Sequence, residues 1–242
     1  MRVMSFNARI DVKSDGDHAF AYRLPHILTF IKDQNPDVIG FQELSPSMLE
    51  VLKRGLEAYV AIGEPRDTKG EANPLFIKRA YTLYEAKTHW YSGKKHVAQT
   101  GAHFPRTFTV VTFVDQTQPI TVINTHLSHV SASARKDAIH TLVAYAKEHD
   151  SAIPLVIMGD FNTTPSEGLL NPLDTLLQSV WHRQTLKPTF HGFTAPTMTE
   201  PIDHMYYSNH WQAQAFKVHD HPKEAILSDH YPISVTLALK NS

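Results

Sequence analysis

The segment at residues 159–165, which reads GDFNTTP, constrains this chain more than any other. It follows the apolar run PLVIM, which has the composition of a buried strand. Gly159 removes a side chain that would crowd the turn, and Pro165 stops the turn from extending. Asp160 and Asn162 are therefore expected to project from one side of the turn at the rim of a sheet. Asp and Asn are also ordinary turn residues, so this segment needs support from the rest of the chain.

Composition limits the classes of protein that the chain can belong to. Its 242 residues are 42% hydrophobic and 19% charged, as in globular proteins. The chain has no cysteine, which excludes disulfides, thiolate zinc sites and cysteine nucleophiles. The formal net charge of −1 provides no general electrostatic attraction to nucleic acid.

The apolar segments also bear on location. No run reaches the ~18–20 apolar residues of a membrane span. The start of the chain, MRVMSF, lacks the apolar stretch of a secretion signal. We therefore expect a cytoplasmic protein without a membrane partner, and the sequence indicates no protein partner.

Apolar runs rich in β-branched residues alternate with amphipathic stretches. The runs predict strands at residues 3–6, 38–42, 59–62, 75–77, 107–114, 120–124, 155–158, 202–207 and 233–239. The amphipathic stretches predict helices at residues 22–33, 47–55, 132–149 and 167–177. The loops expected to select the substrate are 63–73, 91–105 and 184–200. We expect one α/β domain over residues 1–242, with mixed sheets packed between helices.

Polar residues recur at the ends of the predicted strands. They are Asn7, Glu43, His126, Asp160, Asn162, Asp203, Asp229 and His230. Taken singly, each is explained equally well as a turn residue, a strand-end amide or a core histidine. Ligand-handling groups gather at strand ends in sheet-based enzymes, so the whole series predicts a single site.

The residue types in this series suit phosphate chemistry with a metal ion. Carboxylates such as Glu43 and Asp229 are preferred by a hard cation such as Mg²⁺. An imidazole activates water when a second carboxylate fixes its tautomer, which Asp203 is placed to do for His230. His126 is placed to donate to a phosphate oxygen.

The motifs that contain these residues resemble the endonuclease/exonuclease/phosphatase superfamily, which has the DNase I-like fold. The matching segments are SFN (5–7), QE (42–43), NTHL (124–127), GDFN (159–162), ID (202–203) and SDH (228–230). They occur in the family's order and span nearly the whole chain. The resemblance implies a four-layer αββα sandwich, in which two stacked mixed β-sheets are flanked by helices and the site lies at one end of the paired sheets.

The resemblance also implies roles in metal binding and catalysis. Glu43 is similar to the principal Mg²⁺ ligand of the family, with Mn²⁺ as an alternative ion, and Asn7 and Asp229 to its neighbours at the metal. Asp160 is similar to the residue that positions or deprotonates the attacking water. His230, paired with Asp203, is similar to the second catalytic group on the phosphate. Whether Asp160 or His230 acts as the base stays open.

The remaining site residues follow from the same resemblance. Asn162 is similar to a phosphate-orienting group and His126 to an additional catalytic histidine. Arg9 stands where the repair endonucleases have an acid, which favours the small phosphatase- and deadenylase-like branch. Arg106 in a Pro-Arg pair and His191 in a TFHG segment match the same branch, and together with Arg9 they are predicted to contact the substrate phosphate. A surface arginine and an ordinary loop histidine are the alternatives.

The combined interpretation is an Mg²⁺-dependent phosphoester hydrolase, either a phosphodiesterase or a phosphatase, in which water attacks phosphorus with help from Asp and His. Its substrate is a small-molecule phosphoester or a nucleic acid. A metal-dependent nuclease acting on DNA or RNA is the main alternative, which the near-neutral charge does not favour. A non-catalytic binding protein on the same fold is disfavoured because Glu43, Asp160 and His230 are all retained.

Overall fold

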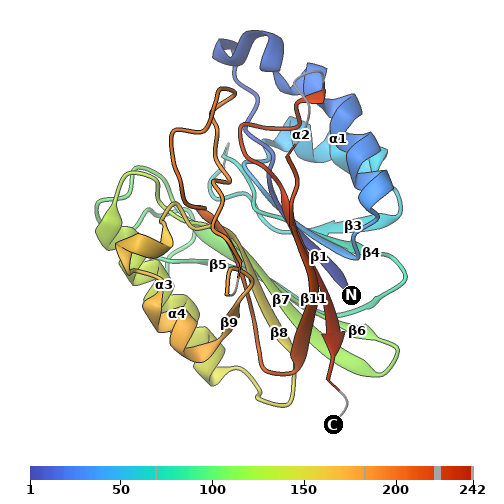
Figure 1. The fold of residues 1–242 in the computed structure, drawn as a ribbon, viewed down its shortest axis with the longest axis vertical. Helices are drawn as coiled ribbons and strands as arrows, with labels where there is room; N and C mark the ends of the chain where they lie inside the picture. The colour runs from blue at the N-terminus through green and yellow to red at the C-terminus, as the bar shows by residue number, and fades with distance from the viewer. Residues whose placement is uncertain (69, 183, 221–224, 241–242) are drawn as a thin grey trace.

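Two six-stranded β-sheets lie face to face in the computed structural model (Figure 1), which describes residues 1–68, 70–182, 184–220 and 225–240. The first sheet contains, in order, β11 (Trp211–Val218), β12 (Ile233–Leu239), β1 (Arg2–Asn7), β2 (Val38–Gln42), β4 (Leu75–Lys78) and β3 (Tyr59–Ile62). The second contains β5 (Thr82–Trp90), β6 (Thr107–Asp115), β7 (Gln118–His126), β8 (Leu155–Asp160), β10 (Asp203–Tyr207) and β9 (Gln178–Ser179). Within each sheet one central pair is parallel, β1 with β2 and β7 with β8.

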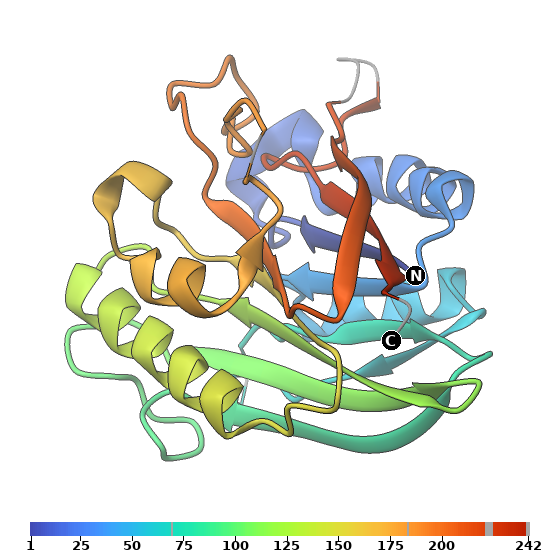
Figure 2. The ribbon, with the colours of Figure 1, turned by 60° about the horizontal axis from the view of Figure 1, so that its bottom comes forward.

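Helices cover the outer face of each sheet (Figures 1 and 2). The first sheet packs against α1 (Phe20–Gln34) and α2 (Pro46–Gly55), and the second against α3 (Ala132–Glu148) and α4 (Asn171–Leu176). Two short 3₁₀ helices, η1 (Lys13–His18) and η2 (Pro165–Glu167), precede α1 and α4. These four layers confirm the predicted αββα sandwich. No helix in the described part of the chain has the length and hydropathy needed to cross a membrane.

Three apolar layers hold the sandwich together, because successive side chains of a strand point to opposite faces. In β8, Val156 and Met158 belong to the core between the sheets. The alternate residues, Leu155 and Ile157, belong to the core under α3 and α4. An uninterrupted apolar run of this kind is thus the pattern of a strand that is buried on both faces.

A buried amide pair crosses from one sheet to the other. The Asn124 side chain in β7 donates to the carbonyl oxygens of Phe41 and Pro74, at 2.7 and 3.0 Å. Gln42 in β2 donates to Asn124 Oδ1 at 2.7 Å. Both amides are fully buried, and leaving such a group unpaired costs about 1–3 kcal/mol. The pair therefore fixes the position of one sheet relative to the other.

The sequence interpretation missed three strands and misplaced one helix. β5, β9 and β11 were not predicted, and β5 and β11 are largely solvent-exposed edge strands without a clear apolar run. The helix predicted at 167–177 is wrong at its start, since η2 ends at Glu167 and α4 begins only at Asn171. Gly168, with a left-handed φ of 71°, separates the two.

Replacing Gly40 should test the rigidity of the amide pair. An added Cβ would lie 2.6 Å from Asn124 Oδ1 and 2.8 Å from the terminal carbon of Met158. We expect Gly40→Ala to lower the free energy of unfolding by about 1–3 kcal/mol, as overpacking of a tight core does. Urea denaturation measures the change. Gly55→Ala, whose new methyl would meet only the side chain of Leu28, is the control and should cost less. An equal or larger loss in the control would contradict a rigid amide pair.

Candidate active site

The carboxyl ends of β1, β2, β7 and β8 meet at one end of the sandwich. Asn7 ends β1, and Glu43 follows β2 from the first sheet. His126 and Asp160 end β7 and β8 of the second sheet, and are register partners. Asp203 opens β10 as the antiparallel partner of Asp160. Residues far apart in the sequence therefore converge because parallel strands end at the same edge.

The backbone turns sharply directly after these strands. Arg9, Glu43 and Asn162 have φ values of 55°, 62° and 50°, in the left-handed region that side chains rarely adopt. Such backbone strain persists only where surrounding contacts hold it, and it is common at functional sites. Gly159 is required for a different reason than a turn, since a Cβ there would collide with the carbonyl group of Thr125 on the neighbouring strand.

The Asp160 carboxylate lies at the centre of the site. Its Oδ2 accepts a hydrogen bond from the Asn7 side chain at 2.9 Å, and its Oδ1 accepts one from the Asn162 backbone N–H at 2.9 Å. His126 Nε2 lies 3.5 Å and His230 Nε2 3.8 Å from Oδ2. Burial, together with the charge of Asp203, raises the pKa of Asp160 above its ordinary range.

The two imidazoles beside Asp160 differ in charge. Asp203 Oδ2 lies 2.9 Å from His230 Nδ1. Burial opposes a charge on His230, but the Asp203 carboxylate outweighs it and raises the pKa of His230. Burial, aided by the positive charge of Arg106, lowers the pKa of His126 well below its ordinary value. At neutral pH the site thus holds a charged His230 and a neutral His126.

A second group of oxygen atoms that could bind a metal ion lies beside Asp160. Asn7 donates to Glu43 Oε1 at 3.2 Å, and the Ile10 backbone donates to Glu43 Oε2 at 3.0 Å. Asp229 lines the same cleft, and burial together with the charge of Glu43 raises its pKa. These are the oxygen ligands that Mg²⁺ prefers.

The charge balance of the cleft favours a cation. Glu43, Asp160 and Asp229 all line it. Arg9, the arginine among the lining residues, is held by Asp15 at 3.0 Å and lies 3.7 Å from Asp229. Even with Arg9 and the charged His230 counted, the three carboxylates, of which Asp160 and Asp229 are buried, leave negative charge in excess, so the residues present fit a divalent metal ion.

Asp160, Asp203 and His230 form another group whose ligand atoms lie within 4.8 Å of one another. In this group Nδ1 of His230 is already hydrogen-bonded to Asp203, and both oxygens of Asp160 accept hydrogen bonds. A metal ion there would have to displace these contacts. The geometry is that of a hydrogen-bonded Asp–His pair beside a carboxylate.

Four further residues were predicted to contact the substrate phosphate, and two of them line the cleft whereas two do not. Asn162 and Arg9 line the cleft. Arg106 is buried and does not line the cleft. Its Nη2 lies 3.0 Å from Nδ1 of His129, which does line the cleft. His191 is buried, stacks on Tyr231 at 4.4 Å, and is not among the lining residues.

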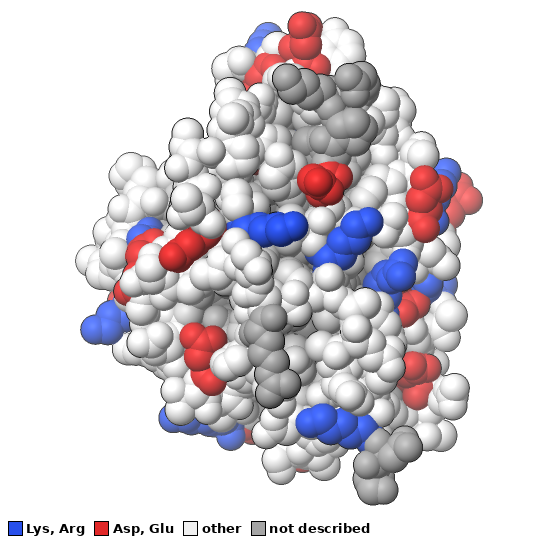
Figure 3. Space-filling model, in the orientation of Figure 1, with Lys and Arg blue, Asp and Glu red and all other residues white. Residues whose placement is uncertain are grey.

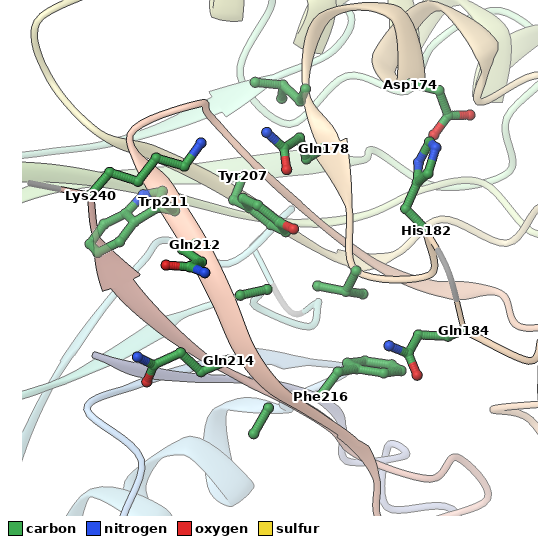
Figure 4. A pocket seen from close by; sticks show the side chains of 14 residues that line it. Asp174, Gln178, His182, Gln184, Tyr207, Trp211, Gln212, Gln214, Phe216 and Lys240 are labelled. Carbon is green, nitrogen blue, oxygen red and sulfur yellow. The ribbon is translucent and has the colours of Figure 1, made fainter.

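The cleft itself is small and has two unlike walls. Its volume is about 370 Å³. Phe190, Met198 and Ile202 form its apolar wall, which lies next to the acids and histidines, since the rings of Phe190 and His230 have centroids 5.0 Å apart. A larger hollow of about 780 Å³ lies along β11 and the far end of β10 (Figure 4). Glutamines, Tyr207, Trp211 and Phe216 line that hollow together with one carboxylate, Asp174, and one imidazole, His182, whereas the smaller cleft has several of each. The chemistry therefore points to the smaller one.

The sequence model of the endonuclease/exonuclease/phosphatase family matches residues 4–230. The chain belongs to this family. The match runs from β1 to His230 and thus includes every strand end described above. The family predicted from the short motifs is confirmed.

Solved structures share this family's fold over almost the whole chain. An endonuclease/exonuclease/phosphatase of Bacteroides vulgatus is 28% identical, with a TM-score of 0.90, and the match covers 99% of this chain and 98% of that one. The mannosyl-6-phosphatase of Bacteroides thetaiotaomicron is 24% identical, with a TM-score of 0.89 and coverage of 99% and 100%. TDP2 of D. rerio, complexed with a single-strand DNA product, is 14% identical, with a TM-score of 0.81 and 98% coverage of each chain. No curated protein matches the sequence.

Sequence reasoning missed the residue that holds the loops of this family member together. Arg23 is buried in α1, and its Nη1 donates to the carbonyl oxygens of Ala8 and Leu227, at 2.7 Å each. Nη2 donates to the carbonyl of Arg9 at 3.0 Å. Arg23 thereby joins the segment after Asn7 to the segment before Asp229. The buried face of α1 consists of Phe20, Arg23, Ile27 and Ile31. A charged residue at a position of this apolar pattern was the sequence signal that could have identified Arg23.

Arg23→Lys should test this role, because a single ammonium group cannot reach the same set of carbonyl oxygens. We expect a loss of about 2–4 kcal/mol in the free energy of unfolding, since hydrogen bonds from a charged group are worth about 1.5–3 kcal/mol and buried carbonyls would lose their donor. Urea denaturation of the variant gives the value. Arg54→Lys, at an exposed position of α2, is the control. Wild-type stability in Arg23→Lys would contradict the role.

Proposed function

We propose that this family member is an Mg²⁺-dependent hydrolase of phosphoester bonds. It acts on a small-molecule phosphoester, either as a phosphatase or as a phosphodiesterase. The observation that carries the proposal is the position of the Asp160 carboxylate. It lies between His126 and His230 at the edge of an oxygen-rich group that contains Glu43 and Asp229. Phosphoester hydrolysis needs a positioned water and positive charge at the phosphate oxygens. Asp160 can position the water, and the charged His230 and a metal ion held by Glu43 and Asp229 would supply the positive charge.

Asp160 is the group that takes the proton of the attacking water in this proposal. Asp203 accepts from Nδ1 of His230 and stabilises the charged imidazole, so Nε2 of His230 carries a proton and acts as a donor to a phosphate oxygen. That leaves the carboxylate of Asp160 as the base. Its raised pKa makes it a stronger base than an ordinary aspartate.

Glu43, Asn7 and Asp229 would hold the metal ion. When bound, Mg²⁺ supplies positive charge to the phosphate and to the leaving oxygen. Asn162 and Arg9 line the cleft in which the phosphate would bind. Arg106 does not line the cleft, but its side chain contacts His129, which does. Neutral His126 lies 3.5 Å from Oδ2 of Asp160, lines the cleft, and would act as a further donor to a phosphate oxygen. His191 stays a predicted substrate contact, although it is buried and does not line the cleft.

The nature of the cleft favours a compact substrate over a nucleic acid strand. A strand binder uses a basic groove that follows the backbone. On the face drawn in Figure 3, Lys and Arg side chains stand in separate groups among uncharged residues and Asp and Glu. Phe190, Met198 and Ile202 also make part of the cleft lining apolar, which does not suit a charged backbone. The mannosyl-6-phosphatase of similar fold is consistent with this preference.

Removal of the base should abolish turnover without unfolding the chain. We expect Asp160→Asn to lower kcat by at least about 10²-fold, the usual contribution of a positioned base. His230→Ala should cost about 10²–10³-fold, as loss of a preorganised donor does. Hydrolysis of bis-p-nitrophenyl phosphate with Mg²⁺ gives both values, and circular dichroism checks the fold. Asp137→Asn, at an exposed position of α3, is the control. Near-normal turnover by Asp160→Asn would contradict the mechanism.

Removal of the principal metal ligand should act on the metal dependence. We expect Glu43→Ala to raise the Mg²⁺ concentration needed for half-maximal activity by about tenfold or more, as loss of one carboxylate ligand weakens a hard-cation site. A titration of activity against Mg²⁺ measures the shift. Glu148→Ala, at the exposed end of α3, is the matched control and should follow the wild-type curve. An unchanged curve for Glu43→Ala would exclude this residue from the metal site.

A further inference from the structure

The apolar wall of the cleft comes from a long connection between β9 and β10. Phe190 and Met198 from this connection line the cleft, and Ile202 follows at its end. The connection also reaches η1 and α1, which cover the other sheet, through Phe193. It therefore passes from one half of the sandwich to the other beside the catalytic residues.

Residues 189–191 of this connection are fixed to the segments that carry the catalytic residues. The Tyr231 backbone N–H donates to the Thr189 carbonyl at 2.7 Å, and Thr189 Oγ1 accepts the Asp203 N–H at 3.1 Å. The His191 N–H donates to the Asp229 carbonyl at 2.9 Å. The ring of Phe190 lies edge-on to that of His230, with centroids 5.0 Å apart. The beginning of the wall is thus tied directly to the catalytic centre.

Phe193 fixes the middle of the connection. Its ring stacks on the imidazole of His18 with a centroid distance of 4.6 Å and an interplanar angle of 13°. The guanidinium carbon of Arg23 lies 5.7 Å from the centroid of the same ring. Phe193 also adopts a left-handed φ of 62°, which is costly for an aromatic residue. Such a conformation persists only where tertiary contacts outweigh its cost, so the stack with His18 determines where the wall lies.

We propose that residues 190–198 form the wall that receives the leaving group of the substrate, and that Phe193 is the positioning residue that anchors this wall to His18 and Arg23. The inference rests on the proposed function, since it assigns the apolar side of the same cleft. An apolar wall of Phe190, Met198 and Ile202 suits the ester of a compact alcohol with an apolar ring face, such as an aryl or sugar ring.

The test separates substrate binding from chemistry. Phe193→Ala and His18→Ala should each raise KM for bis-p-nitrophenyl phosphate by about 2–10-fold, the value of one aromatic pair, while kcat stays within about twofold. The double variant should match Phe193→Ala, because the stack that His18→Ala removes is already lost when Phe193 is truncated. Phe193→Tyr keeps the stack and should restore the wild-type KM. Tyr22→Ala removes an exposed aromatic side chain of α1, the helix that contains Arg23, and is the control.

Hydrogen exchange of the backbone amides in residues 190–198 measures how firmly Phe193 holds this segment, and it needs no enzymatic turnover. We expect exchange there to be faster in Phe193→Ala than in the wild type and in Tyr22→Ala. An inactive wild type would contradict the proposed function, whereas unchanged exchange in Phe193→Ala would overturn the anchor. Faster exchange with an unchanged KM would overturn the assignment of the wall to the leaving group. An increase in KM for Tyr22→Ala as large as that for Phe193→Ala would also overturn it.

Discussion

The site depends on the relative position of two sheets, and the buried amides of Gln42 and Asn124 set that position. Neither sheet carries a complete site. The first provides Asn7 and Glu43, and the second His126 and Asp160. Apolar packing between sheets is non-directional and would tolerate small sliding, whereas amide hydrogen bonds of 2.7 Å are directional and costly to break. Because Glu43 directly follows Gln42 and His126 lies two residues after Asn124, the amides transmit their fixed geometry to the site.

Burial and charge then differentiate chemically similar residues. His126 and His230 both lie beside Asp160, yet only His230 has a carboxylate on its second ring nitrogen. Burial alone makes an imidazole neutral, and it does so for His126. The Asp203 partner reverses that outcome for His230. Asp203, on β10, thus makes the two histidines beside Asp160 different, one neutral and one a charged donor.

The sequence was informative where chemistry and strand pattern coincide. Asp160 and Asn162 follow an apolar run that is buried on both faces, so both the strand and its polar end could be predicted. The sandwich and the family followed from the order of such strand ends. β11 could not be predicted from its alternating Gln and Ala residues, because an exposed edge strand has little apolar pattern. The roles of Arg23 and Phe193 depend on contacts between distant segments, 23 with 227 and 18 with 193, which no local pattern encodes.

Hydrolysis by the wild-type chain, compared with Mg²⁺ and with a chelator, tests the central claim most directly. The substrates are p-nitrophenyl phosphate, bis-p-nitrophenyl phosphate and single-stranded DNA. The account predicts that at least one of the two small phosphoesters is hydrolysed with Mg²⁺, that the chelator stops this reaction, and that the DNA stays intact. Turnover that persists in the chelator, or no turnover of either small ester, would contradict a metal-dependent phosphoester site. Cleavage of the DNA alone would identify a nuclease and contradict the compact-substrate assignment.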